Sequence, residues 1–380
     1  MRGWTADDPL VNPMKIIYYL TAHGYGHAVR SCAICNKFSQ DVRVIFRTLI
    51  PQKFFEEEIK RPFGYSPGHF DCGCIQRDSV TVNKKETLEA YMKLADMNET
   101  RLKQEVKWVL HQGADGMVSD ITPFAFELAT EAGLPSVAVS NFSWYDIYEP
   151  YVGYPAFEPY LLKIRQQYEM AGLLLELMPS TGMPYFQSRL KIPLVGGVGL
   201  NVRDRLQTHL GLKKEKHLAL IYLGEFGMES CAWGDLEKFK EWDFIGIYPI
   251  PGKPANYRLV SKDDFRYLDL VASVDVMISK IGYGIFTQSL MHGTPLIYLP
   301  RDDFAEFPVL EKAMVEWGHG YCLSREDYCK LNWEDVLRKV ISRKRPAPQV
   351  SDGAEICARE IEKFIHGQQV PFPEKMKLGP

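Results

Sequence analysis

The 380-residue sequence lacks the long apolar runs that would place it in a membrane or direct it out of the cell. No segment approaches the roughly 18 consecutive apolar residues that a membrane-spanning helix requires. Residues 1–14 form a short tail without the apolar centre of a signal peptide, so we expect a cytoplasmic protein. The net charge of −3 also lacks the positive excess that binding to nucleic acid or an anionic membrane would favour.

Sequence motifs that bind metal ions or nucleoside triphosphates are missing as well. The eight cysteines form no CxxC pair and no Cys/His metal spacing, which predicts reduced, mostly buried thiols and no metal site. We expect Cys72 and Cys74 on one strand, with their side chains on opposite faces. Neither a Walker A loop nor a dinucleotide fingerprint occurs, because the required glycine spacing and the Lys-Ser/Thr pair are absent.

What the sequence does contain is a unit of strand, glycine turn and helix at residues 15–38. Its IIYYL segment, residues 16–20, is apolar and predicts a buried strand. Gly24 and Gly26 follow, where the backbone must turn sharply or lie close to something, and a helix begins near His27. Such a unit places polar side chains at the carboxyl edge of a sheet, where ligands bind in open α/β folds. His23 and His27 are therefore the first candidates for chemistry.

The rest of the chain continues this alternation in two halves. Residues 161–177 predict a charged helix, and the prolines and glycines of residues 178–200 indicate a linker. The length agrees with two domains, about 15–190 and 195–350, each a parallel sheet with right-handed crossovers. An amphipathic helix at 354–366 follows. We expect a cleft between the carboxyl edges of the two sheets, a common position for a ligand site.

Two glycine turns of the second half are candidates for a diphosphate site. SKIGYG places Gly282 and Gly284 at the opening of a helix, where backbone N–H groups and the helix dipole favour a phosphate. LGEFG, Leu223–Gly227, is a second turn of this kind. Each turn alone is also compatible with a purely structural role, but two turns at one sheet edge favour a diphosphate. The carboxylates that follow Arg301 either form a solvated surface or accept hydrogen bonds from sugar hydroxyls.

His27 is the side chain best suited to act as a general base near neutral pH. The positive end of its helix favours the neutral imidazole, and Asp120, at the tip of another strand in the same sheet, could orient it. Simpler roles as helix caps remain alternatives for both residues. The stretch 141–160 is rich in aromatic residues and proline. We expect these side chains to pack in the hydrophobic core, or else to form a rim on which a sugar ring or an acyl chain stacks.

These motifs resemble those of a known family. TAHGYGHAVR is similar to the histidine-containing first loop of GT-B glycosyltransferases. DCGCIQRDSVTVN, VSDITP, SVAVSNFSWYDIY and SKIGYG…RDDFAEFPVL resemble, in the same order, the N-terminal glycosyltransferase-like region of plant L-arabinokinases and its free-standing bacterial relatives. The resemblance implies a GT-B fold, with two Rossmann-like domains facing each other across a cleft. Residues 15–190 would bind an acceptor, 195–350 would bind a nucleotide-sugar, and helix 354–366 would cross back onto the first domain. No GHMP-type ATP loop is present, so sugar kinase activity is not implied.

The resemblance also implies roles for individual residues. His27 would deprotonate the acceptor hydroxyl, with Asp120 as its partner carboxylate. The residues implied in donor binding are His23, Gly26, Gly224, Phe226, Gly227, Lys280, Gly282, Tyr283, Gly284, Gln288, Asp302, Glu306 and Glu311. The Trp and the His-x-Gly-x-x-Ser motif of secondary-metabolite transferases are missing, which leaves the nucleotide and the sugar open.

The function expected from these features is metal-independent transfer of a sugar from a nucleotide-diphosphate-sugar to an acceptor hydroxyl. The donor would be a substrate, with no tightly bound cofactor. The acceptor would be a small molecule, a glycan or a lipid, and a homodimer is one expectation for the assembly. Hydrolysis or 2-epimerisation of a nucleotide-sugar on the same fold is one alternative, and a non-catalytic protein that binds a nucleotide-sugar is another.

Overall fold

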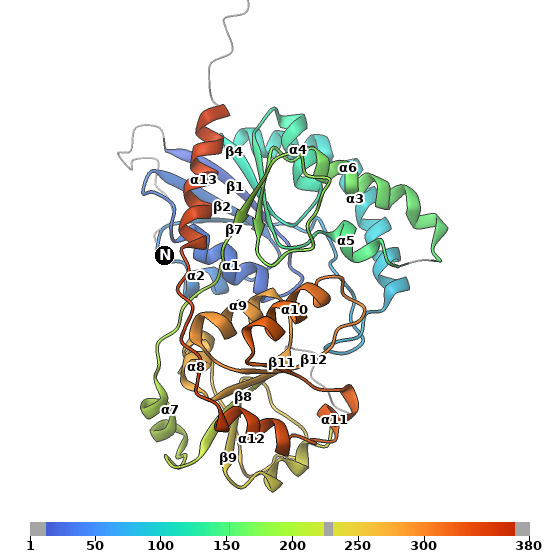
Figure 1. Ribbon diagram of the computed structural model, residues 1–380. Helices are drawn as coiled ribbons and strands as arrows, with labels where there is room; N and C mark the ends of the chain where they lie inside the picture. The colour runs from blue at the N-terminus through green and yellow to red at the C-terminus, as the bar shows by residue number, and fades with distance from the viewer. Residues whose placement is uncertain (1–12, 152, 224–230, 369–380) are drawn as a thin grey trace, which may run out of the picture.

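The computed structural model describes residues 13–151, 153–223 and 231–368, and these form two lobes that each contain one parallel sheet (Figure 1). The N-terminal lobe is built on seven strands in the order β3-β2-β1-β4-β5-β6-β7. Its strands are β1 (Met14–Leu20), β2 (Val42–Thr48), β3 (Gly64–Pro67), β4 (Gly116–Asp120), β5 (Ser136–Ser140), β6 (Leu173–Leu177) and β7 (Arg189–Ile192). Its helices are α1 (Tyr25–Cys35), α2 (Gln52–Glu58), α3 (Lys84–His111), α4 (Phe124–Ala132), α5 (Trp144–Tyr148) and α6 (Glu158–Glu169).

The C-terminal lobe has six strands in the order β10-β9-β8-β11-β12-β13. Its strands are β8 (His217–Tyr222), β9 (Trp242–Gly246), β10 (Tyr257–Leu259), β11 (Val276–Lys280), β12 (Leu296–Leu299) and β13 (Gly320–Cys322). Its helices are α7 (Arg203–Leu210), α8 (Tyr267–Ser273), α9 (Tyr283–His292), α10 (Phe307–Trp317), α11 (Arg325–Cys329) and α12 (Glu334–Ser342). Every strand pairing within the two sheets is parallel.

The apolar runs of the sequence explain which strands lie at the centre. Residues 16–20 of β1 are all buried, because β1 lies between β2 and β4 with helices on both faces of the sheet. Residues 276–279 of β11 have the same position in the second sheet, between β8 and β12. Two doubly covered parallel sheets confirm the predicted α/β class.

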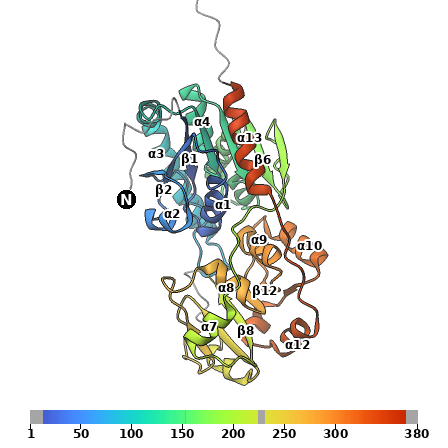
Figure 2. The ribbon, with the colours of Figure 1, turned by 90° about the vertical axis from the view of Figure 1, so that its left-hand side faces the viewer.

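The last helix, α13 (Gly353–Gln368), runs along the N-terminal lobe, although the chain before it belongs to the C-terminal lobe (Figure 2). Its Ile365 packs so closely on Gly116 that a Cβ on this glycine would lie 2.7 Å from the isoleucine side chain. Glu362 accepts hydrogen bonds from the backbone N–H of Ser39 at 2.8 Å and from its hydroxyl at 2.9 Å. The chain therefore crosses between the lobes twice, before α7 and before α13.

Several local predictions are wrong. Residues 161–177 are not one helix, since α6 ends at Glu169 and the buried run 173–177 forms β6, paired with β5. An apolar run buried on both faces has no alternation by which a strand could be recognised. The expected linker contains edge strand β7, and the loop after β2 contains α2 and β3. Cys72 and Cys74 lie in a loop instead of a strand. No helix among the described residues is long and apolar enough to cross a bilayer.

Candidate functional site

The carboxyl ends of β1 and β11 face each other, and the two glycine turns that follow them touch. A Cβ added to Gly284 would lie 3.2 Å from the Cα of Gly26, closer than most Cβ atoms approach a neighbour. Helices α1 and α9 begin at this contact. Gly24, just before α1, has a φ of 112°, a conformation that favours glycine. The backbone contact joins the lobes and places the first turns of α1 and α9 side by side.

His27 and Asp120 meet directly at this edge. His27 Nδ1 lies 2.8 Å from Asp120 Oδ1, and both residues are buried. The contact follows from the sheet, because Asp120 ends β4, its neighbour in β1 is Leu20, and His27 is on the first turn of the helix after β1. A carboxylate at Nδ1 leaves the second ring nitrogen, Nε2, as the one that can accept a proton.

Arg30 is a site residue for which the sequence analysis predicted no role. Its Nε and Nη2 donate to the two oxygens of Asp120 at 2.6 and 2.5 Å, and Nη2 also lies 2.9 Å from His27 Nδ1. Burial alone would raise the pKa of Asp120, but the Arg30 guanidinium and the hydrogen bonds from Arg30 and His27 hold that pKa below its usual value. The i, i+3 spacing of His27 and Arg30 was the one available signal, because it places both side chains on the same face of α1.

A chain of hydrogen bonds continues from Arg30 into the opposite lobe. Arg30 Nη1 donates to Asn141 Oδ1 at 2.8 Å, and Asn141 Nδ2 donates to Glu306 Oε1 at 2.7 Å. The same Glu306 oxygen accepts the backbone N–H of Tyr283 at 3.1 Å. Glu306 thus caps the N-terminus of α9, so the protein's own carboxylate occupies part of the position at which the sequence predicts a phosphate.

A second group of polar side chains surrounds His23 in the same interlobe region. Cys74 N–H donates to His23 Nδ1 at 3.1 Å, and the Phe304 ring stacks on the imidazole at a centroid distance of 6.1 Å. The Arg301 guanidinium lies 4.1 Å from the centroid of the same Phe304 ring. Lys280, at the end of β11, donates to Gln76 at 3.4 Å.

Two cations lie in this second group, and each has a carboxylate near it, Asp78 for Lys280 and Glu306 for Arg301. Burial, then the Arg301 charge, lowers the pKa of Lys280 to about 7. Burial, then His27, Arg301 and Lys280, lowers the pKa of His23 well below its usual value. Arg301 Nε and Gln76 Nε2 are buried donors with no hydrogen-bond partner. Buried donors without partners are costly, and an anion between them would satisfy them. We name Lys280, Arg301, Gln76 and His23 the cation cluster.

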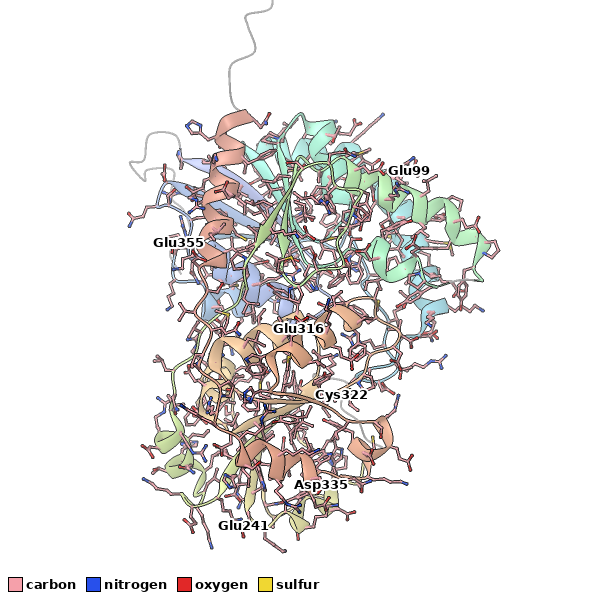
Figure 3. The ribbon with its side chains drawn as sticks, in the orientation of Figure 1. Glu99, Glu241, Glu316, Cys322, Asp335 and Glu355 are labelled. Carbon is pink, nitrogen blue, oxygen red and sulfur yellow. The ribbon has the colours of Figure 1, made fainter. Side chains whose placement is uncertain are left out.

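Other predicted donor residues have different positions. Gln288 is buried on α9 with its side-chain oxygen unpaired, and Tyr283 accepts the N–H of Val195 at its hydroxyl. Asp302 is exposed. Glu311 interacts with the thiol of Cys322, which lies on edge strand β13 (Figure 3). The structure therefore brings Glu306 to the site but not Asp302 or Glu311. Gly224, Phe226 and Gly227 lie outside the described residues.

The aromatic stretch after β5 forms a buried wall beside the cation cluster. Phe142 and Trp144 contact each other and lie against the two histidines. The ring centroids are 5.7 Å apart for Phe142 and His27, and 5.3 Å apart for Trp144 and His23. Both residues are almost fully buried. Core packing, the first of the two predicted roles, therefore describes these residues. Within the described part of the chain, no group of three or more His, Cys, Asp or Glu side chains could hold a metal ion.

Comparison with known proteins identifies the fold. No model of a protein family matches the chain. L-arabinokinase of Arabidopsis thaliana is 29% identical over 362 residues, which are 92% of this chain and 34% of that protein, so this chain spans about a third of that relative. A UDP-N-acetylglucosamine–N-acetylmuramyl-(pentapeptide) pyrophosphoryl-undecaprenol N-acetylglucosamine transferase of Christiangramia forsetii is 26% identical over 154 residues, 38% of this chain and 40% of that one.

Solved structures are similar in fold over 93–95% of this chain. A UDP-glucosyltransferase of Polygonum tinctorium matches with a TM-score of 0.61 at 12% identity, over 94% of this chain and all of that one. The glycosyltransferase of kitacinnamycin matches with a TM-score of 0.60 at 15% identity, over 93% of this chain and 99% of that one. A putative UDP-N-acetylglucosamine 2-epimerase of Listeria monocytogenes matches with a TM-score of 0.56 at 12% identity, over 95% of this chain and 99% of that one. The chain has the GT-B fold, so the predicted fold and the predicted resemblance to a plant L-arabinokinase are confirmed.

Proposed function

We propose that this chain is a glycosyltransferase that moves a sugar from a nucleotide-diphosphate-sugar to an acceptor hydroxyl. The observation that carries the proposal is the arrangement of charge across the interlobe contact. A histidine held by a carboxylate lies on one side, and buried donors without partners lie at the cation cluster beside it. An activated sugar placed between them would meet a base at its acceptor and cations at its leaving group.

The proposed chemistry uses these residues directly. His27 Nε2 takes the proton of the acceptor hydroxyl as its oxygen attacks the anomeric carbon, while Asp120 holds Nδ1. The bond from the anomeric carbon to the diphosphate oxygen breaks, and the electron pair leaves with the nucleoside diphosphate. Lys280 and Arg301 neutralise the charge that develops on this leaving group. With two protein cations in that role, we expect transfer without an added metal ion.

Two other predicted donor contacts, Glu306 and Gln288, keep a proposed role in modified form. Because Glu306 caps α9, we place the diphosphate against Lys280 and Arg301 and not directly on the Tyr283 N–H. Glu306 would then accept hydrogen bonds from hydroxyls of the donor sugar, and the unpaired Gln288 oxygen would accept one from the nucleoside. UDP-sugars are the first donors to test, since the names of the Christiangramia, Polygonum and Listeria proteins contain UDP.

Nucleotide binding tests the donor site without knowledge of the acceptor. UDP and UDP-sugars should raise the melting temperature of the wild-type protein. Lys280→Met or Arg301→Met should weaken the binding by about tenfold or more, because each removes a charged hydrogen-bond donor. Lys216→Met is the matched control, since Lys216 already pairs with Asp243 at 3.1 Å. Equal stabilisation of all three variants by UDP would contradict the proposed diphosphate position.

Turnover tests the base. In a screen of acceptors with the donor that binds, His27→Ala should lower kcat by about 10²–10⁴-fold while UDP still stabilises the variant. Unchanged turnover would remove His27 from the mechanism. Release of free sugar without an acceptor would instead indicate a hydrolase or 2-epimerase. Stabilisation by the nucleotide-sugar with no turnover of any acceptor would indicate a binding protein.

A further inference from the structure

Arg30 is more buried than most charged residues, and the mechanism proposed above gives it no role. It is 2% exposed and lies one helical turn after His27. Arginine is rarely buried to this extent unless it is paired. All three of its guanidinium nitrogens make hydrogen bonds of 2.5–2.8 Å to protein groups, to Asp120 and Asn141.

The first consequence concerns the orientation of Asp120. Two parallel N–H···O bonds from Arg30 hold the carboxylate in one plane, and the Ser31 hydroxyl donates to Oδ2 at 3.2 Å. Oδ2 therefore accepts two hydrogen bonds from α1, and Oδ1 is turned toward His27 Nδ1. A carboxylate held in this way favours the imidazole tautomer with its proton on Nδ1, which leaves the lone pair on Nε2.

The second consequence concerns charge. A carboxylate alone beside a histidine stabilises the imidazolium, which cannot accept a proton. Here the guanidinium neutralises Asp120, so the net charge that His27 meets from this pair is close to zero. Arg30 Nη2 also lies 2.9 Å from His27 Nδ1, and because it can only donate, it would bind Nδ1 in the other tautomer, in competition with Asp120. The other charged or titratable groups near His27 are Asp71, which accepts a hydrogen bond from Thr21 at 2.6 Å, and His23 of the cation cluster.

The third consequence links the base to the opposite lobe. Asn141 bridges Arg30 and Glu306, so a shift of the C-terminal lobe that moves Glu306 also removes the partner of Asn141 Nδ2. Arg30 keeps its Asp120 contacts within the N-terminal lobe in either case. The hydrogen bonds that begin at Asp120 thus end at Glu306, the residue before α10 in the C-terminal lobe.

We propose that Arg30 is a positioning residue, which orients Asp120 so that His27 carries its proton on Nδ1. Its value for sugar transfer rests on the proposed function, but its effect on His27 can be measured in the protein without substrate. No contact of Arg30 with donor or acceptor is needed.

NMR of protein labelled with ¹⁵N-histidine tests the proposal directly. The His27 signals are identified by their loss in His27→Asn. The wild-type protein should show a neutral His27 with the proton on Nδ1. In Arg30→Gln both hydrogen bonds that orient Asp120 are weakened, so the His27 tautomer should become mixed. In Arg30→Lys the charge remains but the two parallel hydrogen bonds to Asp120 are lost, so the tautomer should become mixed here as well.

Arg47→Gln is the matched control, because it also removes two parallel hydrogen bonds from an arginine to a carboxylate. Arg47 binds both oxygens of Glu105 in the same lobe, at 2.8 and 2.9 Å, and makes no contact with His27. It should lower stability without changing the His27 signals. If Arg30→Gln does not fold, the His27 tautomer in Arg30→Lys alone tests the proposal. An unchanged His27 tautomer in Arg30→Lys, or in a folded Arg30→Gln, would overturn the proposal.

Kinetics separate this proposal from the proposed function. Once a donor and an acceptor are known, Arg30→Lys should lower kcat with little change in the KM for the donor, because donor contacts are intact. If no nucleotide binds the wild-type protein, the proposed function fails while the NMR result still decides the role of Arg30. If turnover occurs and His27 is insensitive to Arg30, only the positioning role fails.

Discussion

Lys280 shows how a residue becomes reactive through its surroundings. It is half-buried at the end of β11, with Arg301 nearby, and burial followed by the Arg301 charge lowers its pKa to about 7. In the unfolded chain a lysine side chain keeps a pKa of about 10.4. Between pH 7 and about 10 the unfolded chain therefore binds more protons at this residue than the folded protein does.

This difference predicts a pH dependence of stability. The free energy of unfolding should rise with pH from 7 to about 10 through Lys280, because the neutral amine is the form that the fold accommodates. Lys280→Met should therefore flatten this rise, with its largest relative gain in stability at or below pH 7. Urea denaturation at several pH values measures the effect, and Lys216→Met serves as the control. Parallel curves for Lys280→Met and wild type would contradict the lowered pKa.

The same residue makes nucleotide binding depend on pH. The protonated amine attracts a diphosphate, so affinity for UDP should fall as the pH rises through 7. Isothermal titration calorimetry with UDP at pH 6 and pH 8.5 measures this change, and Lys280→Met should remove most of it. A fall of equal size in Lys280→Met would assign the pH dependence to another group.

At the scale of elements, the contact between α1 and α9 depends on two glycines that are not equivalent. A Cβ on Gly284 would approach the Cα of Gly26 at 3.2 Å, whereas a Cβ on Gly26 would lie 3.8 Å from the Cα of Gly284. The first distance requires a backbone shift of a few tenths of an ångström, and the second is an ordinary van der Waals contact. Both residues are on the first turn of a helix, where alanine is otherwise the better helix former.

Alanine at these two positions should have opposite effects. Gly26→Ala should leave stability unchanged or raise it by up to about 1 kcal/mol, through helix propensity. Gly284→Ala should push the two helix starts apart and reduce UDP binding, with less change in the unfolding of each lobe. Chemical denaturation and UDP titration of both variants measure the contrast. Equal UDP affinities in the two variants would show that the close approach does not matter for binding.

Element prediction succeeded where glycine residues mark an end and failed where a run is apolar throughout. Helix α1 begins at Tyr25, directly after Gly24, and α9 begins at Tyr283, directly after Gly282, as the two glycine turns predicted. Residues 173–177 gave no such signal, because a strand covered on both faces and a buried helix have the same composition. The predicted fold class is still correct, because one misassigned strand at the side of the sheet does not change the order of the central strands.

At the scale of the whole molecule, a hairpin of the N-terminal lobe reaches into the C-terminal lobe. Residues 76–82 form the hairpin, closed by a bridge between Gln76 and Val82. Ser79 Oγ donates to the carbonyl of Leu223 at 2.9 Å, and Val80 packs in the core of the C-terminal lobe. Val82, two residues later, packs in the core of its own lobe instead. The hairpin therefore fastens the lobes together next to Lys280.

The two valines provide a matched test of this fastening. Val80→Ala and Val82→Ala each remove about 1–2 kcal/mol of buried apolar contact, at about 0.8 kcal/mol for each buried CH₂-sized group. Only Val80→Ala should release the hairpin, and so raise the rate of limited proteolysis within residues 76–82 and increase the radius of gyration measured by X-ray scattering. Equal proteolysis of the two variants would contradict the idea that Val80 fastens the lobes.

The sequence alone determined the fold class and the meeting of His27 with Asp120. Both follow from chain order, because neighbouring parallel strands end at the same edge and a helix after a glycine turn begins there. Only the tertiary structure decided the partners of Arg30, the capping of α9 by Glu306, and the unpaired donors around Lys280. These contacts join side chains from separate segments, such as Arg30 with Asn141, 111 residues apart, and Lys280 with Gln76, 204 residues apart, and no local pattern of residues records which of them meet.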